Sequence, residues 1–208
     1  MIARAAKLDS MRAKGINPYA STKYSRTHTA LDIRRLCESG SLPQNVRLAG
    51  RLLTVRVMGK AIFANIEDES GKMQIFLSRS EIGVEKFDLF RDHLERGDYI
   101  GVVGGMFRTK TGEITLKVED YTILSKAIRP LPEKWYGLQD AEVRQRQRYL
   151  DLASSPEVRE RFRKRSQIVW LMRQYLQGEG FMEVETPVLQ ELHGGAAARP
   201  FVTHHNAL

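Results

Sequence analysis

The chain has 208 residues, of which 42% are hydrophobic, and a formal net charge of +8. This length accommodates one or two domains, and no apolar run approaches the roughly 18–20 residues of a membrane-spanning helix. The positive charge permits binding to a polyanion such as nucleic acid, although many proteins without such a partner are also basic.

The first 44 residues are predicted to be a helical extension. Residues 7–14 form a basic helical piece, and Thr29 is a plausible N-cap for a short helix over 30–36. The first 15 residues carry charges and no apolar core, so we expect no secretory signal. Cys37 is the only cysteine and can form neither an internal disulfide nor a zinc site, which favours a reducing, cytoplasmic location.

Three strands are predicted next, over residues 46–57, 61–67 and 72–77. Apolar and polar residues alternate along each of them, as expected when one face of a strand is buried. Gly50 permits a bend in the long first strand, and residues 68–71 form a hairpin turn.

A helix and two further strands complete this region. Apolar residues three and four positions apart predict a helix that begins near Val84 and ends at Gly97. Strands follow over 99–107 and 113–124. Three strands, a helix and two strands, with a long bent first strand, is the order of a five-stranded Greek-key barrel of the oligonucleotide-binding type.

Beyond the barrel the pattern becomes helical. Two prolines, Pro130 and Pro132, exclude regular structure from a linker. Residues 140–149 are predicted to form a short charged helix, and Ser154 or Ser155 to cap a longer helix with Pro156 in its first turn. Five basic residues of the longer helix form either a solvated face or a contact surface for a tRNA backbone: Arg159, Arg161, Arg163, Lys164 and Arg165.

Residues 180–187 are predicted to be a short strand that ends at a proline, and a glycine-rich loop follows at Gly194. A strand needs neighbouring strands, and a glycine-rich loop of this kind is expected to bind a ligand. Neither is evident in the rest of the sequence, so we expect the chain to be the N-terminal part of a larger protein. His204 and His205 are adjacent and would point apart on a strand, so they form no metal pair. No Ser/His/Asp, Cys/His or paired-carboxylate arrangement stands out, and we expect no metal site and no catalytic residue here.

The barrel carries the residues best suited to contact single-stranded nucleic acid. Phe63 faces away from Ile62 and Ile66, so it either caps an open end of the barrel or stacks on a base. Gln74 has a donor and an acceptor and can read a Watson–Crick edge, although a solvated strand residue is the simpler interpretation. Glu113 opens the fifth strand beside a turn, where a surface charge is the simplest interpretation. Basic residues lie on or beside the first strand: Arg51, Arg56 and Lys60.

Several segments together resemble the N-terminal part of bacterial class II lysyl-tRNA synthetases. Residues 56–61 with Phe63 are similar to the family's first barrel turn, residues 180–187 are similar to class II motif 1, and residues 194–208 are the most lysine-specific piece. Further similar segments extend the resemblance over nearly the whole chain: 109–113, 129–132, 137–140 and 146–152.

The resemblance implies an α+β chain in four parts. A helical extension over 1–44 precedes an OB-fold anticodon-binding barrel over 45–126. A linker over 127–139 leads to the incomplete start of a class II catalytic domain over 140–208, which includes motif 1.

The resemblance also implies roles for individual residues of the barrel. Phe63 matches an aromatic residue that stacks on an anticodon base. Gln74 and Glu113 match residues that read the edges of anticodon bases, and Arg56 matches a nearby contact. The partner of this face is therefore expected to be tRNA(Lys).

Two regions outside the barrel receive roles from the same resemblance. Motif 1 forms a homodimer interface in the family, which would place Phe181 and Pro187 at that interface. The loop near the lysine substrate would include Gly194, Gly195 and Ala196.

The activity implied is the ligation of lysine to tRNA, with ATP and Mg²⁺ as cofactors. Class II motifs 2 and 3, with their ATP-binding arginines, have no counterpart in these 208 residues, and the acidic residues that hold Mg²⁺ and the lysine ε-ammonium are absent too, so we expect this chain alone to make no lysyl-adenylate. Two alternatives remain: a free-standing tRNA-binding module, and a related synthetase for aspartate or asparagine. Residues 194–208 argue against the latter.

Overall fold

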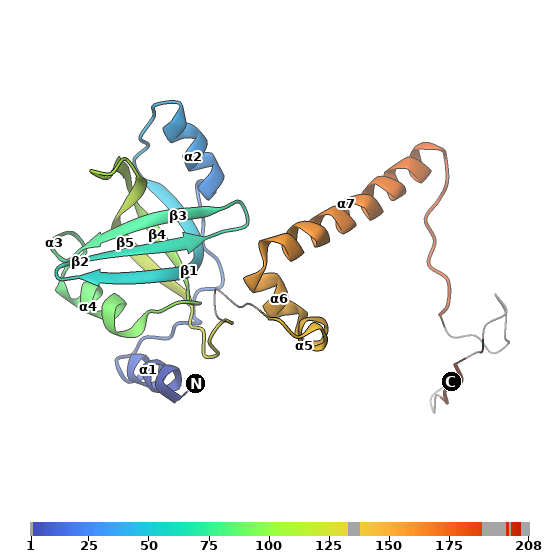
Figure 1. Cartoon of the computed structure of the whole chain (residues 1–208), viewed down its shortest axis with the longest axis horizontal. Coiled ribbons are helices and arrows are strands. Elements are labelled where there is room, and N and C mark those ends of the chain that lie inside the picture. Colours follow the sequence, from blue (N-terminus) through green and yellow to red (C-terminus); the bar gives the residue numbers. More distant parts are fainter. Residues whose placement is uncertain (1, 133–137, 189–198, 200, 205–208) are drawn as a thin grey trace. The chain divides into compact units, whose positions relative to one another are not determined.

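The computed structural model describes residues 2–132, 138–188, 199 and 201–204. They fall into two compact units, Met1–Leu150 and Asp151–Leu208. The first unit contains all the strands of the described chain, and the second is dominated by one long helix (Figure 1).

Five strands of the first unit form a closed barrel with the order β1-β2-β3-β5-β4 (Figure 1). The strands β3 and β5 are parallel, and every other pairing is antiparallel. This confirms the predicted five-stranded barrel of the oligonucleotide-binding type. The strands are β1 (Val46–Met58), β2 (Ala61–Glu67), β3 (Lys72–Ser78), β4 (Tyr99–Arg108) and β5 (Ile114–Ser125).

The barrel interior follows from the alternation along β2 and β3. Ile62, Ala64 and Ile66 of β2 are buried, as predicted, while the residues between them are only partly covered. Met73, Ile75 and Leu77 of β3 repeat this pattern. Because successive side chains of a strand point to opposite faces, the intervening residues, Phe63 and Gln74 among them, lie on the outer face.

Two glycines, one in β1 and one in β4, lie where the backbone of an adjacent strand comes close to their Cα atoms. A Cβ at Gly50 would lie 2.8 Å from the Glu67 carbonyl oxygen, and the register of β1 shifts between Leu52 and Thr54. The irregularity in the pairing of β1 with β2 thus lies just beyond Gly50, where the close approach of the Glu67 backbone leaves no room for a side chain. A Cβ at Gly104 would overlap the carbonyl oxygen of Lys117, so this position accepts no side chain without movement of β5.

The segment between β3 and β4 contains two helices, α3 (Arg79–Ile82) and α4 (Val84–His93). Gly83 separates them with a φ of 84°, a conformation that favours glycine. Phe87 and Phe90 of α4 are buried in the barrel core. The helix ends at His93, four residues before the predicted stop at Gly97.

The N-terminal extension contains α1 (Ile2–Ala13) and α2 (Ala30–Glu38). Thr29 is the N-cap of α2, as predicted. Its side chain accepts a hydrogen bond from the Asp32 amide, and the Asp32 carboxylate accepts one from the Thr29 amide, which completes a capping box. Ile33 and Cys37 of α2 are fully buried and join the barrel core. The extension is therefore packed on the barrel rather than a separate domain.

In the described part of the chain after the barrel there are three helices: α5 (Ala141–Arg146), α6 (Arg148–Ser154) and α7 (Pro156–Gly178). The charged helix predicted over 140–149 is interrupted at Gln147, whose φ of −107° and ψ of 52° lie outside the helical region. Ser155 caps α7 by accepting a hydrogen bond from the Val158 amide, and Pro156 occupies its first turn, as predicted.

The strand predicted over residues 180–187 is not formed. Phe181–Pro187 has no strand assignment, and the described residues of the second unit include no other strand with which it could pair. A strand is stabilised by its neighbour, so an extended sequence without one does not form a ladder. Within the described residues, no helix has the length and apolar content that a membrane crossing requires.

Candidate nucleic-acid interface

The outer face of β1, β2 and β3 carries two adjacent rows of side chains. Register pairing aligns Arg56 of β1 with Phe63 of β2, and Phe63 with Phe76 of β3. The neighbouring row places Asn65 of β2 opposite Gln74 of β3. The two rows are two residues apart along each strand, or roughly 7 Å. An aromatic row thus lies directly beside a polar row.

The aromatic row is extended by a third ring. The rings of Phe63 and Phe76 are tilted, with centroids 4.9 Å apart, and Phe107 of β4 meets Phe76 edge to face with centroids 5.9 Å apart. All three side chains are only partly buried. Contacts of this geometry restrain ring orientation, so Phe63 is held from the side by Phe76 while part of it stays accessible.

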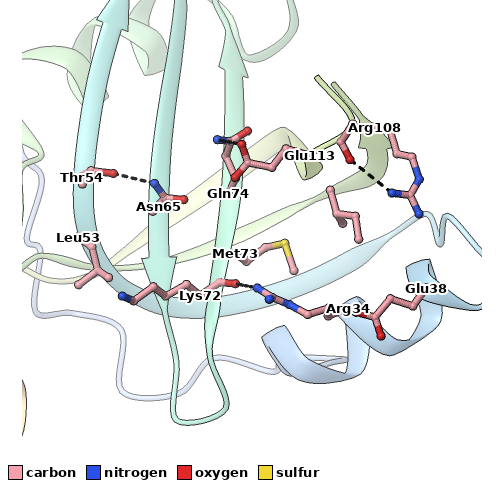
Figure 2. Close-up of a pocket in the computed structure, with 12 residues that line it drawn as sticks. Arg34, Glu38, Leu53, Thr54, Asn65, Lys72, Met73, Gln74, Arg108 and Glu113 are labelled. Carbon is pink, nitrogen blue, oxygen red and sulfur yellow. Dashed lines mark hydrogen bonds between the residues drawn. The ribbon is translucent and has the colours of Figure 1, made fainter. Parts of the chain in front are cut away.

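The polar row contains a closely coupled pair. Gln74 Nε2 donates to Glu113 Oε2 over 2.8 Å (Figure 2). The two residues are 39 positions apart in the sequence and meet because β3 and β5 are adjacent and parallel. In the same row, Asn65 Nδ2 donates to Thr54 Oγ1 over 2.9 Å. The face therefore presents amide and carboxylate groups in fixed positions, the groups that read base edges.

These polar groups line a pocket of about 450 Å³ between the strands and α2. This volume falls within the roughly 300–1,000 Å³ of ordinary ligand sites. The pocket includes Gln74 and Glu113 but not Phe63 or Arg56. Residues from α2, the strands and the β4–β5 turn contribute to its wall: Arg34, Glu38, Leu53, Thr54, Asn65, Lys72, Met73, Gln74, Arg108, Gly112, Glu113 and Ile114.

Two arginines hold α2 against the strands as a wall of this pocket. Arg34 donates to the carbonyl of Lys72 over 3.0 Å, and Arg108 donates to the carbonyl of Cys37 over 2.9 Å. Both side chains also line the pocket, together with Glu38 of α2, so this wall carries charges of both signs (Figure 2).

Asp68 ties the beginning of α2 to the β2–β3 hairpin. It accepts hydrogen bonds from the amides of Ala30, Ser70 and Gly71. Burial alone would raise the pKa of the Asp68 carboxyl, but these hydrogen bonds outweigh it and hold the pKa below its usual value. Asp68 is therefore ionised at neutral pH and keeps α2 in place beside the pocket.

Comparison with known proteins identifies both parts of the chain. The model described as an OB-fold nucleic acid binding domain matches residues 46–124, and the model for class II tRNA synthetases (D, K and N) matches residues 140–208. The lysine–tRNA ligase of Pelotomaculum thermopropionicum is 51% identical over 100% of this chain and 40% of its own length. Those of Carboxydothermus hydrogenoformans and Enterococcus faecalis are 51% and 45% identical over 99% and 100% of this chain.

The chain is a homologue of lysine–tRNA ligases. It spans about two fifths of the length of the curated relatives it matches. The class II model also covers aspartate and asparagine enzymes, but these three relatives are all named lysine–tRNA ligase.

The other residues predicted to matter in a lysine–tRNA ligase homologue lie outside the barrel. Phe181 and Pro187 follow α7 in an exposed segment without strand structure. Gly194, Gly195 and Ala196 lie outside the described residues. Among the residues described, no group of three His, Cys, Asp or Glu side chains could hold a metal ion.

Sequence reasoning missed Phe76, Phe107 and Thr115. Phe76 follows the same alternation as Phe63, which could have drawn attention to it. Phe107 and Thr115 are near Phe76 and Gln74 only through the strand order of the barrel. No local pattern indicates that proximity.

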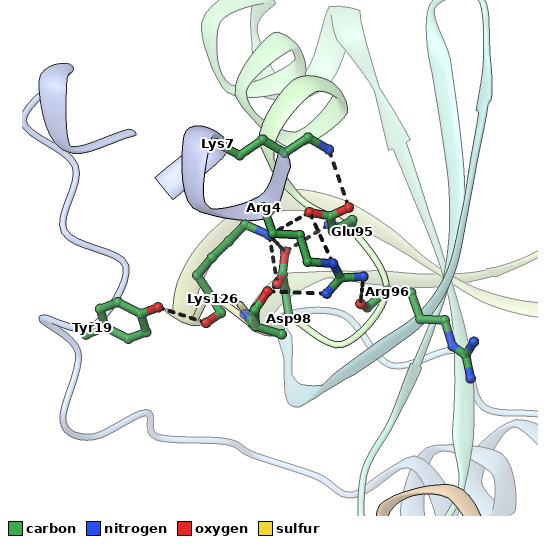
Figure 3. A network of polar contacts seen from close by, with 8 residues as sticks. Arg4, Lys7, Tyr19, Glu95, Arg96, Asp98 and Lys126 are labelled. Atoms are coloured by element: carbon green, nitrogen blue, oxygen red, sulfur yellow. Dashed lines mark hydrogen bonds and ion pairs between the residues drawn. The ribbon is translucent and has the colours of Figure 1, made fainter. Parts of the chain in front are cut away.

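A second polar network, on other elements, has a structural role (Figure 3). Lys126 and Asp98 form a fully buried ion pair of 2.9 Å. Glu95 contacts Lys126 at 3.1 Å and is approached from α1 by Lys7 at 3.5 Å. Arg4 of α1 also donates to the carbonyl of Ala127 over 3.2 Å. These contacts attach α1 to the barrel and to the start of the linker.

Proposed function

We propose that this chain recognises the anticodon of a lysine tRNA, as part of a lysine–tRNA ligase that works in the cytoplasm. The observation that carries this proposal is the Gln74–Glu113 pair, held in a pocket beside the partly exposed Phe63 ring. Single-strand readers of this fold combine an aromatic platform with polar groups that meet base edges.

In this proposal one anticodon base stacks on Phe63. Gln74 offers both a donor and an acceptor to the Watson–Crick edge of a base, and Glu113 offers acceptors to a base N–H. Arg56, exposed and in register with Phe63, contacts the phosphate backbone next to the stacked base.

The test is equilibrium binding of RNA hairpins that carry the lysine anticodon or a scrambled one. The proposal expects tighter binding to the lysine anticodon and a decrease of that preference in Gln74→Ala. An equal affinity of the wild-type chain for both hairpins would contradict it.

The complete ligase would activate lysine with ATP and Mg²⁺ and transfer it to the 3′ end of tRNA. We infer this activity from the relatives, all named lysine–tRNA ligase, of which the chain spans about two fifths. In the same proposal, Gly194, Gly195 and Ala196 lie near the bound lysine.

We further propose that the chain forms a homodimer through α7 and the segment that contains Phe181 and Pro187. The second half of α7 supports this, because it exposes large apolar side chains that a partner would cover: Ile168, Trp170, Leu171, Met172, Tyr175 and Leu176. Sedimentation equilibrium should detect a dimer that Phe181→Asp weakens. A monomer at all accessible concentrations would contradict the proposal.

A further inference from the structure

Gln74 has a second hydrogen-bond partner, which is hidden beneath the outer face. Thr115 Oγ1 donates to Gln74 Oε1 over 2.7 Å. The same hydroxyl lies 3.3 Å from the Glu113 carbonyl oxygen, but it has a single hydrogen and the contact with Gln74 is the shorter one. Thr115 is 0% exposed. The three side chains therefore form a chain of hydrogen bonds in the order Thr115, Gln74, Glu113.

This chain of hydrogen bonds gives the Gln74 amide one orientation. An ionised carboxylate only accepts hydrogen bonds, so the Glu113 side must receive the Gln74 NH₂ group. The amide oxygen then faces Thr115. One N–H and one lone pair of Gln74 remain free for a ligand, and their positions would exchange if the amide rotated by half a turn.

The two partners of Gln74 differ in how firmly they are held. Glu113 is exposed and directly follows the turn at Gly112, so a base N–H can compete for its carboxylate. Thr115 lies on β5, paired with Gln74 on one side and Phe107 on the other, and no ligand can reach it. Once a base occupies Glu113, Thr115 is the remaining side chain that favours this orientation. Its hydroxyl donates to the amide oxygen over 2.7 Å, whereas a rotated amide would leave that hydrogen only the longer contact of 3.3 Å with the Glu113 carbonyl.

We propose that Thr115 is a positioning residue that sets base selectivity through Gln74, an inference that rests on the proposed function. Uracil presents a carbonyl acceptor beside an N–H donor on its Watson–Crick edge, and cytosine presents an amino donor beside a nitrogen acceptor. A fixed amide matches one of these patterns, whereas an amide free to rotate matches either. Thr115 thus maintains discrimination between the two pyrimidines.

The experiment measures the affinity of the full chain for lysine anticodon hairpins in which each anticodon uridine is replaced singly by cytidine. In the wild type, one position should show a preference for uridine. Thr115→Val keeps the shape but removes the donor, and we expect the preference at that position to fall by about 3- to 10-fold, the worth of one hydrogen bond. Thr115→Ser restores the hydroxyl and should retain the preference.

The controls separate this proposal from the underlying one. If Thr115→Val retains the wild-type preference while Gln74→Ala loses it, Thr115 has no positioning role, although the proposed function stands. If the wild type shows no preference at any position, both fail. Thermal melting verifies that each variant is folded, and Thr115→Ala replaces Thr115→Val in the same comparison if the latter does not fold.

Discussion

Phe63 of β2 and Phe76 of β3 are register partners whose ring centroids lie 4.9 Å apart. Phe63 is the ring of this pair that we propose to stack on an anticodon base. We expect Phe63→Ala to weaken binding of a lysine anticodon hairpin by about 1–3 kcal/mol, the usual contribution of one stacked base. Fluorescence anisotropy measures this loss. Tyr99→Ala is the control, because Tyr99 is an exposed aromatic of β4 that contacts neither the aromatic row nor the pocket. Equal losses in the two variants would argue against a specific platform.

Arg56 should contribute through a phosphate contact rather than through base reading. Log affinity should fall linearly with log salt concentration, because each neutralised phosphate releases counterions. We expect Arg56→Ala to reduce that slope by about 0.7, the value for one phosphate of a single strand. Its preference for the lysine anticodon over a scrambled one should persist. An unchanged slope in Arg56→Ala would show that Arg56 makes no phosphate contact.

The buried pair of Asp98 and Lys126 should stabilise the first unit. Asp98 accepts hydrogen bonds from Lys126 and from the amides of Glu95 and Ala127. Asp98→Ala leaves the ammonium of Lys126 buried without its main partner, and we expect a loss of about 3–5 kcal/mol in the free energy of unfolding. Urea unfolding followed by circular dichroism measures it.

The matched control for Asp98→Ala is Glu69→Ala, which breaks the exposed ion pair between Glu69 and Arg26. Exposed pairs contribute about 0–1 kcal/mol, so this variant should be close to the wild type. A loss in Asp98→Ala no larger than in Glu69→Ala would show that the buried network is not a stabilising one.

His93 should make stability depend on pH. Its ring is buried and Nε2 lies 3.1 Å from Ser10 Oγ of α1. Burial lowers the pKa of His93 below its usual 6.5, and the charge of Lys14 lowers it further, while Asp92 opposes this shift. As the pH falls, the His93 ring therefore binds a proton in the unfolded chain before it does so in the folded one. The contribution of neutral His93 to the free energy of unfolding is complete above about pH 6.5 and is lost as the pH falls through the folded-state pKa.

Comparison of the wild type with His93→Gln tests this pH dependence. The free energy of unfolding of the wild type should decrease between pH 7.5 and 5.5 by more than that of the variant. Identical decreases in the two proteins would assign the acid sensitivity to other groups, such as the hydrogen-bonded carboxyl of Asp68, whose pKa is lowered from 3.8 and which loses its contribution only at more acidic pH.

The barrel was predictable because its signals are local. The buried set of Ile62, Ala64 and Ile66 follows from the two-residue period of a strand, and Thr29 and Ser155 carry their capping role in their own sequence context. The same alternation predicts that Phe63 and Gln74 lie on the outer face, without any knowledge of strand pairing.

What could not be predicted depends on contacts between distant segments. Gln74 meets Thr115 across 41 positions of sequence, and only the parallel pairing of β3 with β5 brings them together. The prediction of a strand over 180–187 was wrong because a strand also depends on contacts with a distant segment. The sequence of 180–187 favours an extended backbone, but strand formation needs a neighbour that the local sequence does not supply.

The central claim is that the outer face of the barrel reads anticodon bases. The most direct measurement is the ratio of affinities for a lysine anticodon hairpin and for the same hairpin with all three anticodon bases exchanged, determined at one fixed salt concentration. We expect a preference of about tenfold or more for the lysine anticodon, since one well-placed base contact is worth about 1–3 kcal/mol. The preference should decrease in Gln74→Ala, since Glu113 remains to contact a base. Equal affinities for the two hairpins in the wild-type chain would contradict the claim.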